Sequence, residues 1–100
     1  DVHTLCIEGP AFDLLTTMSK FLCIGMPLTE VIRAATDNPA RALTRPDLGT
    51  FRTGAAGDAS VLSLDDGRFD YVDSTGAHLA GEQRLSAKAT IIGGAVFHAN

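Results

Sequence analysis

The apolar side chains follow a helical period through the first half of the chain. Their recurrence every three or four residues predicts an amphipathic helix over residues 11–24, which Gly25 ends because glycine adopts a left-handed conformation readily. The same spacing predicts a second helix over residues 27–37. Asn38 can cap a short third helix over residues 39–43 with its side chain. The first half is therefore expected to be helical after its opening residues.

The second half alternates apolar and polar residues, or groups them in short β-branched runs. A buried strand is predicted over residues 59–64, followed by a hairpin turn at Asp66-Gly67 and a returning strand over residues 69–72. Residues 77–85 are weakly patterned and are expected to form a loop with at most one short strand. A second hairpin is predicted from the strands 87–92 and 95–98.

The stretch from Leu48 to Leu64 joins the two halves and contains three glycines within ten residues. Its Gly-x-x-x-x-Gly-x-x-Gly-Asp-Ala pattern invites comparison with a phosphate-binding loop. Such a loop needs a strand before the glycines and a helix N-terminus after them. Here a helix precedes the glycines and a strand follows, so the stretch is interpreted as a joint between helices and sheet.

These elements predict an α+β fold with two to three helices followed by a small antiparallel sheet of four or five short strands. Residues 1–7 also alternate and are expected to form the tail of a strand. The sheet needs cover on at least one face, either from the helices or from further strands that would complete a sandwich. The chain of 100 residues begins at Asp1 rather than Met, so it is expected that the chain can be a piece of a longer protein.

Composition and charge narrow the possible partners. The net charge is −4 and the eight Lys and Arg residues are scattered, so no nucleic acid partner is expected. No apolar run approaches the roughly 20 residues that span a bilayer, and the start lacks a signal-peptide pattern, so a cytoplasmic protein without a membrane partner is expected. Cys6 and Cys23 are too far apart for a CxxC motif and are expected to be free thiols.

Few polar side chains cluster in a way that suggests chemistry. Asp1 and His3 would share one face of a strand, where a carboxylate and an imidazole can bind a metal or relay a proton, but two ligands do not make a metal site. Cys6 beside His3 lacks a third orienting group and is interpreted as a packed thiol. The remaining candidates are interpreted as solvated side chains in loops, turns or terminal sequence: His78, His98, Asp65, Asp66, Asp70 and Asp73.

The first 43 residues, DVHTLCIEGPAFDLLTTMSKFLCIGMPLTEVIRAATDNPARAL, resemble the last barrel segment of the amidohydrolase superfamily. The GPA-x-DL-x-TTMSKFL and AT-x-NPA-x-AL runs are similar to those of its dihydroorotase-like and deacetylase-like members. LGTFRTGAAGDASVLSL resembles the element that begins that family's return into a β-sandwich, and Ala89 to Gly94 resemble its final strand and turn. The resemblance covers nearly the whole chain.

This resemblance implies a fold and an activity. Residues 1–47 would be the end of a TIM-type (β/α)8 barrel, and residues 48–100 would be part of a composite β-sandwich. The parent enzyme would be a metal-dependent hydrolase of amide C–N bonds in small molecules, with a divalent metal, expected to be zinc. Asp1 would contact the metal, take a proton from the attacking water and deliver it to the leaving amine. His3 would lie near the pocket without an assigned ligand role.

The other metal ligands of that superfamily have no counterparts in these 100 residues. The chain alone is therefore expected to bind no metal and to be inactive. Helix faces that would have packed on the barrel are expected to cause self-association; they carry Phe12, Leu15, Phe21 and Leu22. The alternative is a stand-alone helix-plus-sheet module with a binding or structural role and no catalysis.

Overall fold

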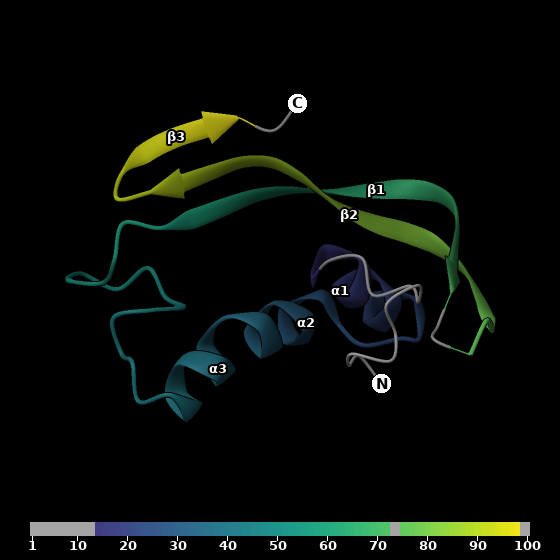
Figure 1. The fold of residues 1–100 in the computed structure, drawn as a ribbon, viewed down its shortest axis with the longest axis horizontal. Coiled ribbons are helices and arrows are strands. Elements are labelled where there is room, and N and C mark those ends of the chain that lie inside the picture. Colours follow the sequence, from purple (N-terminus) through teal and green to yellow (C-terminus); the bar gives the residue numbers. More distant parts are fainter. Residues whose placement is uncertain (1–13, 73–74, 99–100) are drawn as a thin grey trace. The chain divides into compact units, whose positions relative to one another are not determined.

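The computed structural model describes residues 14–72 and 75–98. In this part of the chain three helices precede three strands (Figure 1): α1 Leu14–Cys23, α2 Leu28–Ala35, α3 Asp37–Ala42, β1 Ala59–Val72, β2 His78–Ile92 and β3 Ala95–His98. The expected α+β order of helices followed by sheet is confirmed. The strand predicted over residues 1–7 lies outside the described residues.

The sheet has the strand order β1-β2-β3 within the described part of the chain. β2 pairs antiparallel with β3, and Ile92 faces Ala95 across the turn. Gly93 and Gly94 form this turn with φ values of 56° and 83°. Two consecutive positive φ angles match the two-residue turn that suits the twist of a hairpin. The predicted Gly-Gly hairpin is therefore confirmed.

The hairpin predicted at Asp66-Gly67 is wrong, because β1 runs through both residues to Val72. Gly67 does not have the positive φ that such a turn requires. Its missing side chain serves another purpose, since a Cβ there would lie 3.1 Å from Cζ of the Phe69 ring. An aromatic ring covering a glycine in a strand is a known way to retain glycine there.

The expectation of a loop over residues 77–85 is wrong from residue 78 onward, because residues 78–85 belong to the long strand β2. Every second residue from Leu79 to Ile91 except Gln83 is apolar or glycine, which is the pattern of a half-buried strand. Several of these positions carry Gly or Ala, which weakens the hydrophobic signal. The described sheet thus has three strands, two of them long, instead of four or five short ones.

The observed helix ends differ from the predicted bounds by up to two residues, and capping contacts are found at them. Gly25, with φ 103°, ends α1: its N–H donates to the carbonyl of Leu22, and the N–H of Met26 donates to that of Phe21. This pair of bonds is the Schellman motif. α2 ends at Ala35 rather than near residue 37, because Thr36 leaves the helical conformation with φ −127° and ψ −82°; its N–H bonds the Arg33 carbonyl and its hydroxyl the Ile32 carbonyl.

α3 begins at Asp37, two residues before its predicted start, and ends at Ala42. Asp37 is in the first turn, where a carboxylate is favoured by the helix dipole, and it forms an ion pair of 2.9 Å with Arg41. Pro39 is the third helical residue, and its missing N–H falls among those without an intrahelical partner. The predicted cap at Asn38 is therefore wrong by two residues.

The chain divides into two compact units, and β1 and β2 contribute to both. One unit contains α1 and residues 64–86, with Met18, Ser19, Tyr71 and Leu85 buried. The other contains residues 27–63 and 87–100, with Val31, Ala40 and Ala89 buried. The domain division expected between residues 47 and 48 rests on the resemblance and stays a prediction.

Candidate functional site

Asp1, the candidate for metal binding and proton transfer, lies outside the described residues. His3, the candidate neighbour of the pocket, and Cys6 also lie outside them. Among residues 14–72 and 75–98, no group of three or more His, Cys, Asp or Glu side chains is arranged to hold a metal ion. The part of the chain that the structure describes therefore does not by itself fit a metal centre. What it does define is the scaffold that would follow Asp1 along the chain.

Ser19 joins α1 to β2 and is the only fully buried side chain of the described residues. Its hydroxyl donates to the carbonyl of Leu15 at 2.7 Å and accepts from the backbone N–H of Leu85 at 3.0 Å. The second bond gives a strand N–H an acceptor beneath the helix. Ser19 is therefore a structural link between elements 66 residues apart.

Replacing Ser19 with alanine is expected to lower the free energy of unfolding by about 1–3 kcal/mol, because the buried N–H of Leu85 would lose its acceptor. Urea unfolding followed by circular dichroism measures this change. Ser60→Ala is the matched control, since Ser60 is exposed on β1. An equal effect of the two substitutions would contradict the structural role of Ser19.

Three further side chains complete this link. Tyr71 donates its hydroxyl hydrogen to the carbonyl of Gln83 at 2.8 Å, and Cys23 approaches the same oxygen with Sγ at 3.5 Å. Burial raises the pKa of Tyr71 above its ordinary value, which keeps the phenol neutral and donating. Lys20 donates to the carbonyl of Val72 at 2.6 Å. These contacts fix α1 on β1 and β2. Cys23 is a free thiol, as expected.

The carboxylates expected in a hairpin turn lie on a strand instead. Asp65 accepts from the hydroxyl of Ser86 at 2.6 Å, and Asp70 lies 2.7 Å from Nδ1 of His78. His78 is on β2 rather than in a loop, and both members of its pair are more than 60% exposed. His98 is exposed on β3. Asp66, Asp70, His78 and His98 are exposed, as expected, although their secondary structure differs, whereas Asp65 is half-buried. Asp73 lies outside the described residues.

A shallow cavity of about 340 Å³ lies beside β1 in the α1 unit. Arg84 places its guanidinium 4.6 Å from the centre of the Phe69 ring, a cation–π contact. Arg84 and Phe69 line the cavity together with Thr16, Arg68, Asp70, Tyr71 and Val72. The residues that line it carry no catalytic assignment.

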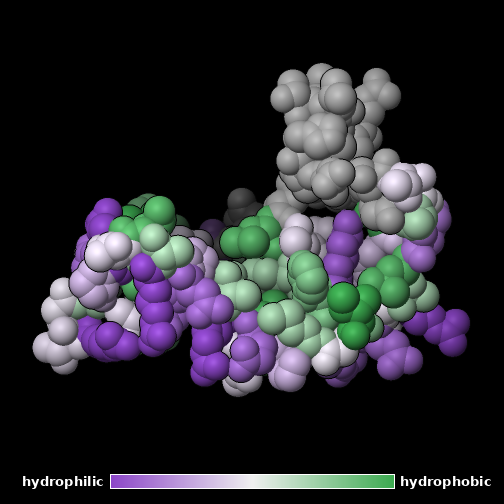
Figure 2. Space-filling view, turned by 90° about the horizontal axis from the view of Figure 1, so that it is seen from below, coloured by the Kyte–Doolittle hydropathy of each residue, from purple (hydrophilic) through white to green (hydrophobic). Residues whose placement is uncertain are grey.

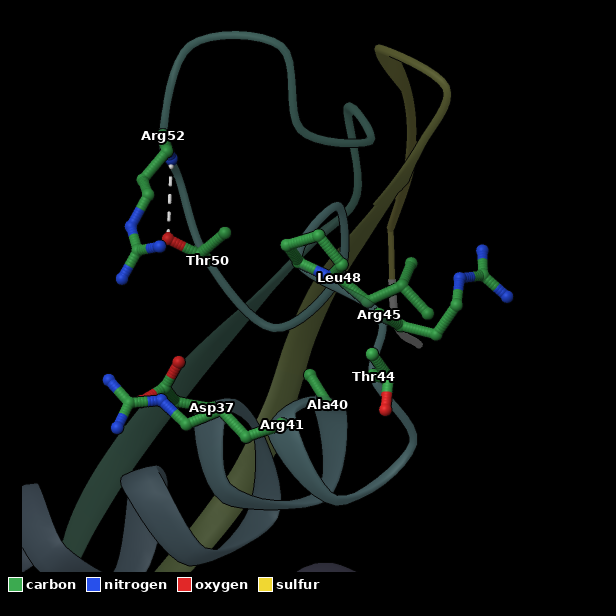
Figure 3. Close-up of a pocket in the computed structure, with 9 residues that line it drawn as sticks. Asp37, Ala40, Arg41, Thr44, Arg45, Leu48, Thr50 and Arg52 are labelled. Carbon is green, nitrogen blue, oxygen red and sulfur yellow. Dashed lines mark hydrogen bonds and ion pairs between the residues drawn. The ribbon is translucent and has the colours of Figure 1, made fainter.

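A second cavity, of about 240 Å³, lies between α3 and the loop that follows it (Figure 3). The guanidinium groups of Arg41 and Arg52 lie on the same side of it as Asp37, whereas the Arg45 side chain points the opposite way. Arg45 instead binds Asp47 through two hydrogen bonds of 3.0 and 2.9 Å, and this pair lowers the pKa of the Asp47 carboxyl and raises that of Arg45. The ion pairs here are exposed, so each contributes little to stability.

The glycine-rich joint has a structural role that its sequence did not indicate. The Asp58 carboxylate accepts from the N–H of Gly93 at 2.9 Å, and the carbonyl of Gly57 accepts from the N–H of Gly94 at 2.9 Å. A Cβ at position 57 would lie 3.2 Å from the nitrogen of Gly94, so glycine permits this approach. We call Gly57 and Asp58 the turn latch. The interpretation as a helix-to-sheet joint is confirmed by the observed order of elements.

Comparison with known proteins identifies the class. The model of the amidohydrolase family matches residues 5–96, so the chain belongs to the amidohydrolase family. A deacetylase of Brucella anthropi is 36% identical over 76 residues, which are 76% of this chain and 19% of that protein. The family resemblance inferred from the sequence is confirmed.

Two solved structures share the fold of the chain. An adenine deaminase superposes with a TM-score of 0.88 at 27% identity over 96% of this chain, and a dihydroorotase with a TM-score of 0.83 at 30% identity over 100% of it. The chain covers 26% and 27% of these two structures. It thus spans about a quarter of the solved structures and about a fifth of the curated deacetylase. No helix of the described residues is long and apolar enough to cross a membrane.

Proposed function

We propose that this chain is the C-terminal part of a metal-dependent hydrolase that cleaves amide C–N bonds in small molecules. The family match over residues 5–96 carries the proposal. The similarity to a deacetylase and to a dihydroorotase supports an acyl C–N bond as the bond that is cleaved. N-acyl amino acids and cyclic amides are the two substrate classes compatible with these relatives.

In this proposal Asp1 is the catalytic residue that these 100 residues contribute. A carboxylate next to the attacking water takes its proton and then passes that proton to the departing nitrogen, which avoids expelling an amide anion. His3, two residues further along the chain, would neighbour the pocket. Both assignments come from the family motif.

A divalent metal, with zinc as the expected ion, is part of the same proposal. A bound metal ion lowers the pKa of water and so supplies a nucleophile near neutral pH. Asp1 would be one ligand, and the others would come from outside this chain. The isolated chain is therefore proposed to bind no metal and to be inactive.

The proposal predicts that the complete polypeptide hydrolyses members of a panel of N-acyl amino acids and cyclic amides. Removing the metal with a chelator is expected to abolish hydrolysis, and adding zinc to restore it, whereas the 100-residue chain is expected to be inactive under all conditions. Release of free amine or ring opening is the readout. Hydrolysis that survives removal of all metal would contradict metal dependence, and an inactive, metal-free complete protein would favour the non-catalytic module.

The architectural part of the proposal assigns residues 1–47 to the end of the barrel and residues 48–100 to a composite β-sandwich. The superposition of almost the whole chain on an adenine deaminase and a dihydroorotase supports this assignment. A cytoplasmic location is also proposed, and the free thiol of Cys23 is compatible with that reducing compartment.

Exposed apolar side chains on α1 and directly after it lead to a prediction about the isolated chain. Leu14, Phe21 and Ile24 are 62%, 47% and 63% exposed, and the space-filling view shows apolar patches among polar side chains (Figure 2). Leu15 and Leu22 are half-buried, and Phe12 lies outside the described residues. The isolated 100-residue chain is expected to self-associate through α1. Light scattering measures this, with Phe21→Asp expected to reduce it; a monomer at all concentrations would contradict the prediction.

A further inference from the structure

The cavity between α3 and the loop that follows it carries more positive than negative side chains. Three arginines line it, and Asp37 is the only carboxylate that does so among the described residues. The chain as a whole has a net charge of −4, so this local excess of positive charge runs against the overall balance. Arg45 is bound by Asp47 and points the opposite way. Arg41 and Arg52, set against Asp37, therefore give the cavity a charge that attracts anions (Figure 3).

The guanidinium of Arg52 has hydrogen-bond donors to spare. It forms no hydrogen bond or ion pair with another residue in the ranges 14–72 and 75–98, where only the backbone of Arg52 is bonded, its N–H donating to the Thr50 hydroxyl at 3.3 Å. Arg41 meets Asp37 with Nε at 2.9 Å. A guanidinium has five N–H donors, so an ion pair through Nε leaves donors of Arg41 for a second anion.

Backbone contacts fix both walls of the cavity before any ligand binds. At the end of α3, the N–H groups of Thr44 and Arg45 donate to carbonyls of that helix at 3.0 and 2.8 Å, which is the Schellman motif. Thr44 has φ 55° in this turn, the only positive φ of a described residue other than glycine. Gly49 then brings the loop against the backbone of Thr36. A site whose walls are already held loses less conformational entropy when a ligand binds.

The donors of this cavity suit a small tetrahedral oxyanion. Because the Thr50 hydroxyl accepts the N–H of Arg52, its own hydrogen can be donated to a ligand. Arg41 supplies donors from α3, and Thr50 and Arg52 supply them from the loop. A carboxylate has two oxygens in one plane, which a single guanidinium fork satisfies, whereas a phosphate group has three acceptor oxygens and up to two negative charges.

The size of the cavity points to the same class of ligand. Its volume of about 240 Å³ lies below the roughly 300–1,000 Å³ of pockets that enclose drug-sized ligands. Arg41 and Arg52 are both exposed, so an anion can reach them from solvent. The cavity can thus hold a single anionic group, either free or at the end of a small molecule.

We propose that this cavity is a binding site for a phosphate group, held by Arg41 and Arg52 with the Thr50 hydroxyl as a further donor. Asp37 is a positioning residue, because its ion pair orients the guanidinium of Arg41. Inorganic phosphate and a small phosphate monoester present the same group to these donors. The inference does not rest on the proposed function, since none of these residues takes part in the proposed proton transfers.

Calorimetric titration of the complete protein with inorganic phosphate tests the site. The dissociation constant is expected to be on the order of 1 mM or lower, the affinity that a few charged contacts provide. Arg52→Gln and Arg41→Gln are each expected to weaken binding about 10–100-fold, because charged hydrogen bonds are lost. No binding of phosphate, or binding that neither substitution weakens, would overturn the proposal.

Arg33→Gln is the matched control. Arg33 is an exposed arginine of α2 in an ion pair with Glu30, as Arg41 is with Asp37, but it does not line the cavity. Its replacement makes the same change of charge and is expected to leave phosphate binding unchanged. An equal loss of affinity in Arg33→Gln and Arg52→Gln would assign the binding to the general charge of the protein and overturn the proposal.

Two further probes distinguish the geometry and the source of the anion. Acetate is expected to bind at least about 10-fold more weakly than phosphate, because it offers fewer acceptor oxygens. Equal binding of acetate and phosphate would overturn the assignment to a phosphate group. Glycerol phosphate binding more tightly than inorganic phosphate would identify a phosphate monoester as the ligand, and weaker binding would identify free phosphate; both results support the site if Arg52→Gln weakens them.

Thermal unfolding gives a second readout and shows whether the variants fold. Arg52→Gln is expected to melt at the wild-type temperature without phosphate, because Arg52 is exposed and its side chain has no partner among the described residues. Phosphate at about 100 times its dissociation constant is expected to raise the melting temperature of the wild type and of Arg33→Gln, but not that of Arg52→Gln. An equal rise in Arg52→Gln would overturn the proposal.

These outcomes are separate from those that test amide hydrolysis. Phosphate bound at the proposed metal centre would remain bound in Arg52→Gln, so only binding that depends on Arg52 supports the cavity site. Such binding in a protein that hydrolyses no amide would support this proposal and contradict the proposed function. The two proposals can therefore fail independently.

Discussion

Asp1→Asn in the complete enzyme is expected to lower kcat for amide hydrolysis by about 10²–10⁴-fold, the contribution of a positioned acid–base group. The amide has the size of the carboxylate but can neither accept a proton from the attacking water nor deliver one to the leaving nitrogen. Steady-state kinetics on an N-acyl amino acid or cyclic amide gives the ratio of rates. KM is expected to change less than kcat, because the proton transfers occur in the transition state.

Asp66→Asn is the matched control for this measurement. It makes the same chemical change in an exposed carboxylate on β1, and it is expected to leave kcat unchanged. An active Asp1→Asn enzyme would remove Asp1 from the catalytic machinery. Equal losses in both variants would point to a general effect of charge on the protein and would contradict the specific role of Asp1.

Gly49→Ala is expected to lower the free energy of unfolding by about 2–5 kcal/mol, the sum of a left-handed conformation for a non-glycine residue and an overlap in a packed region. Gly49 has φ 67°, and a Cβ there would overlap the backbone carbonyl of Thr36 at the junction of α2 and α3. Because the obstructing atoms are backbone, no rotamer change relieves the contact. Thermal and urea unfolding measure the loss.

Gly54→Ala is the control that separates the cost of the left-handed conformation from the cost of the steric overlap. Gly54 has φ 90°, but a Cβ there would meet nothing within 4 Å. This variant is expected to cost only about 1–2 kcal/mol, the price of the left-handed conformation. A Gly49→Ala protein no less stable than Gly54→Ala would show that the loop does not approach Thr36 as the structure describes.

The sequence predicted those elements whose signals are local. The helical period of apolar residues predicted α1 and α2. Gly25 predicted the end of α1, and Gly93-Gly94 predicted a hairpin turn, because each of these positions needs a positive φ. Asp66-Gly67 was misinterpreted because the same dipeptide can form a turn or a strand. In the structure the Phe69 ring lies beside Gly67, a contact that the dipeptide itself does not indicate.

Long-range contacts account for the other differences. Residues 78–85 of β2 were missed because their buried side includes Gly81, which has no side chain and adds no hydrophobic signal. Gly81 is required there, since a Cβ would overlap Sγ of Cys23. Ser19 bonds Leu85 across 66 residues and Asp58 bonds Gly93 across 35, and no local pattern indicates either partner. The sequence showed the glycine-rich motif that contains Gly57 and Asp58, but it did not show that these residues bind the turn at Gly93 and Gly94.

The central claim is that this chain is part of a metal-dependent amide hydrolase. The most direct test is a denaturing intact mass combined with elemental metal analysis of the protein purified from its natural source. The account predicts a polypeptide several times longer than this chain, on the scale of a barrel with an appended domain, carrying one or two divalent metal ions. A metal-free polypeptide of 10.5 kDa would contradict it and leave a scaffold without the chemistry.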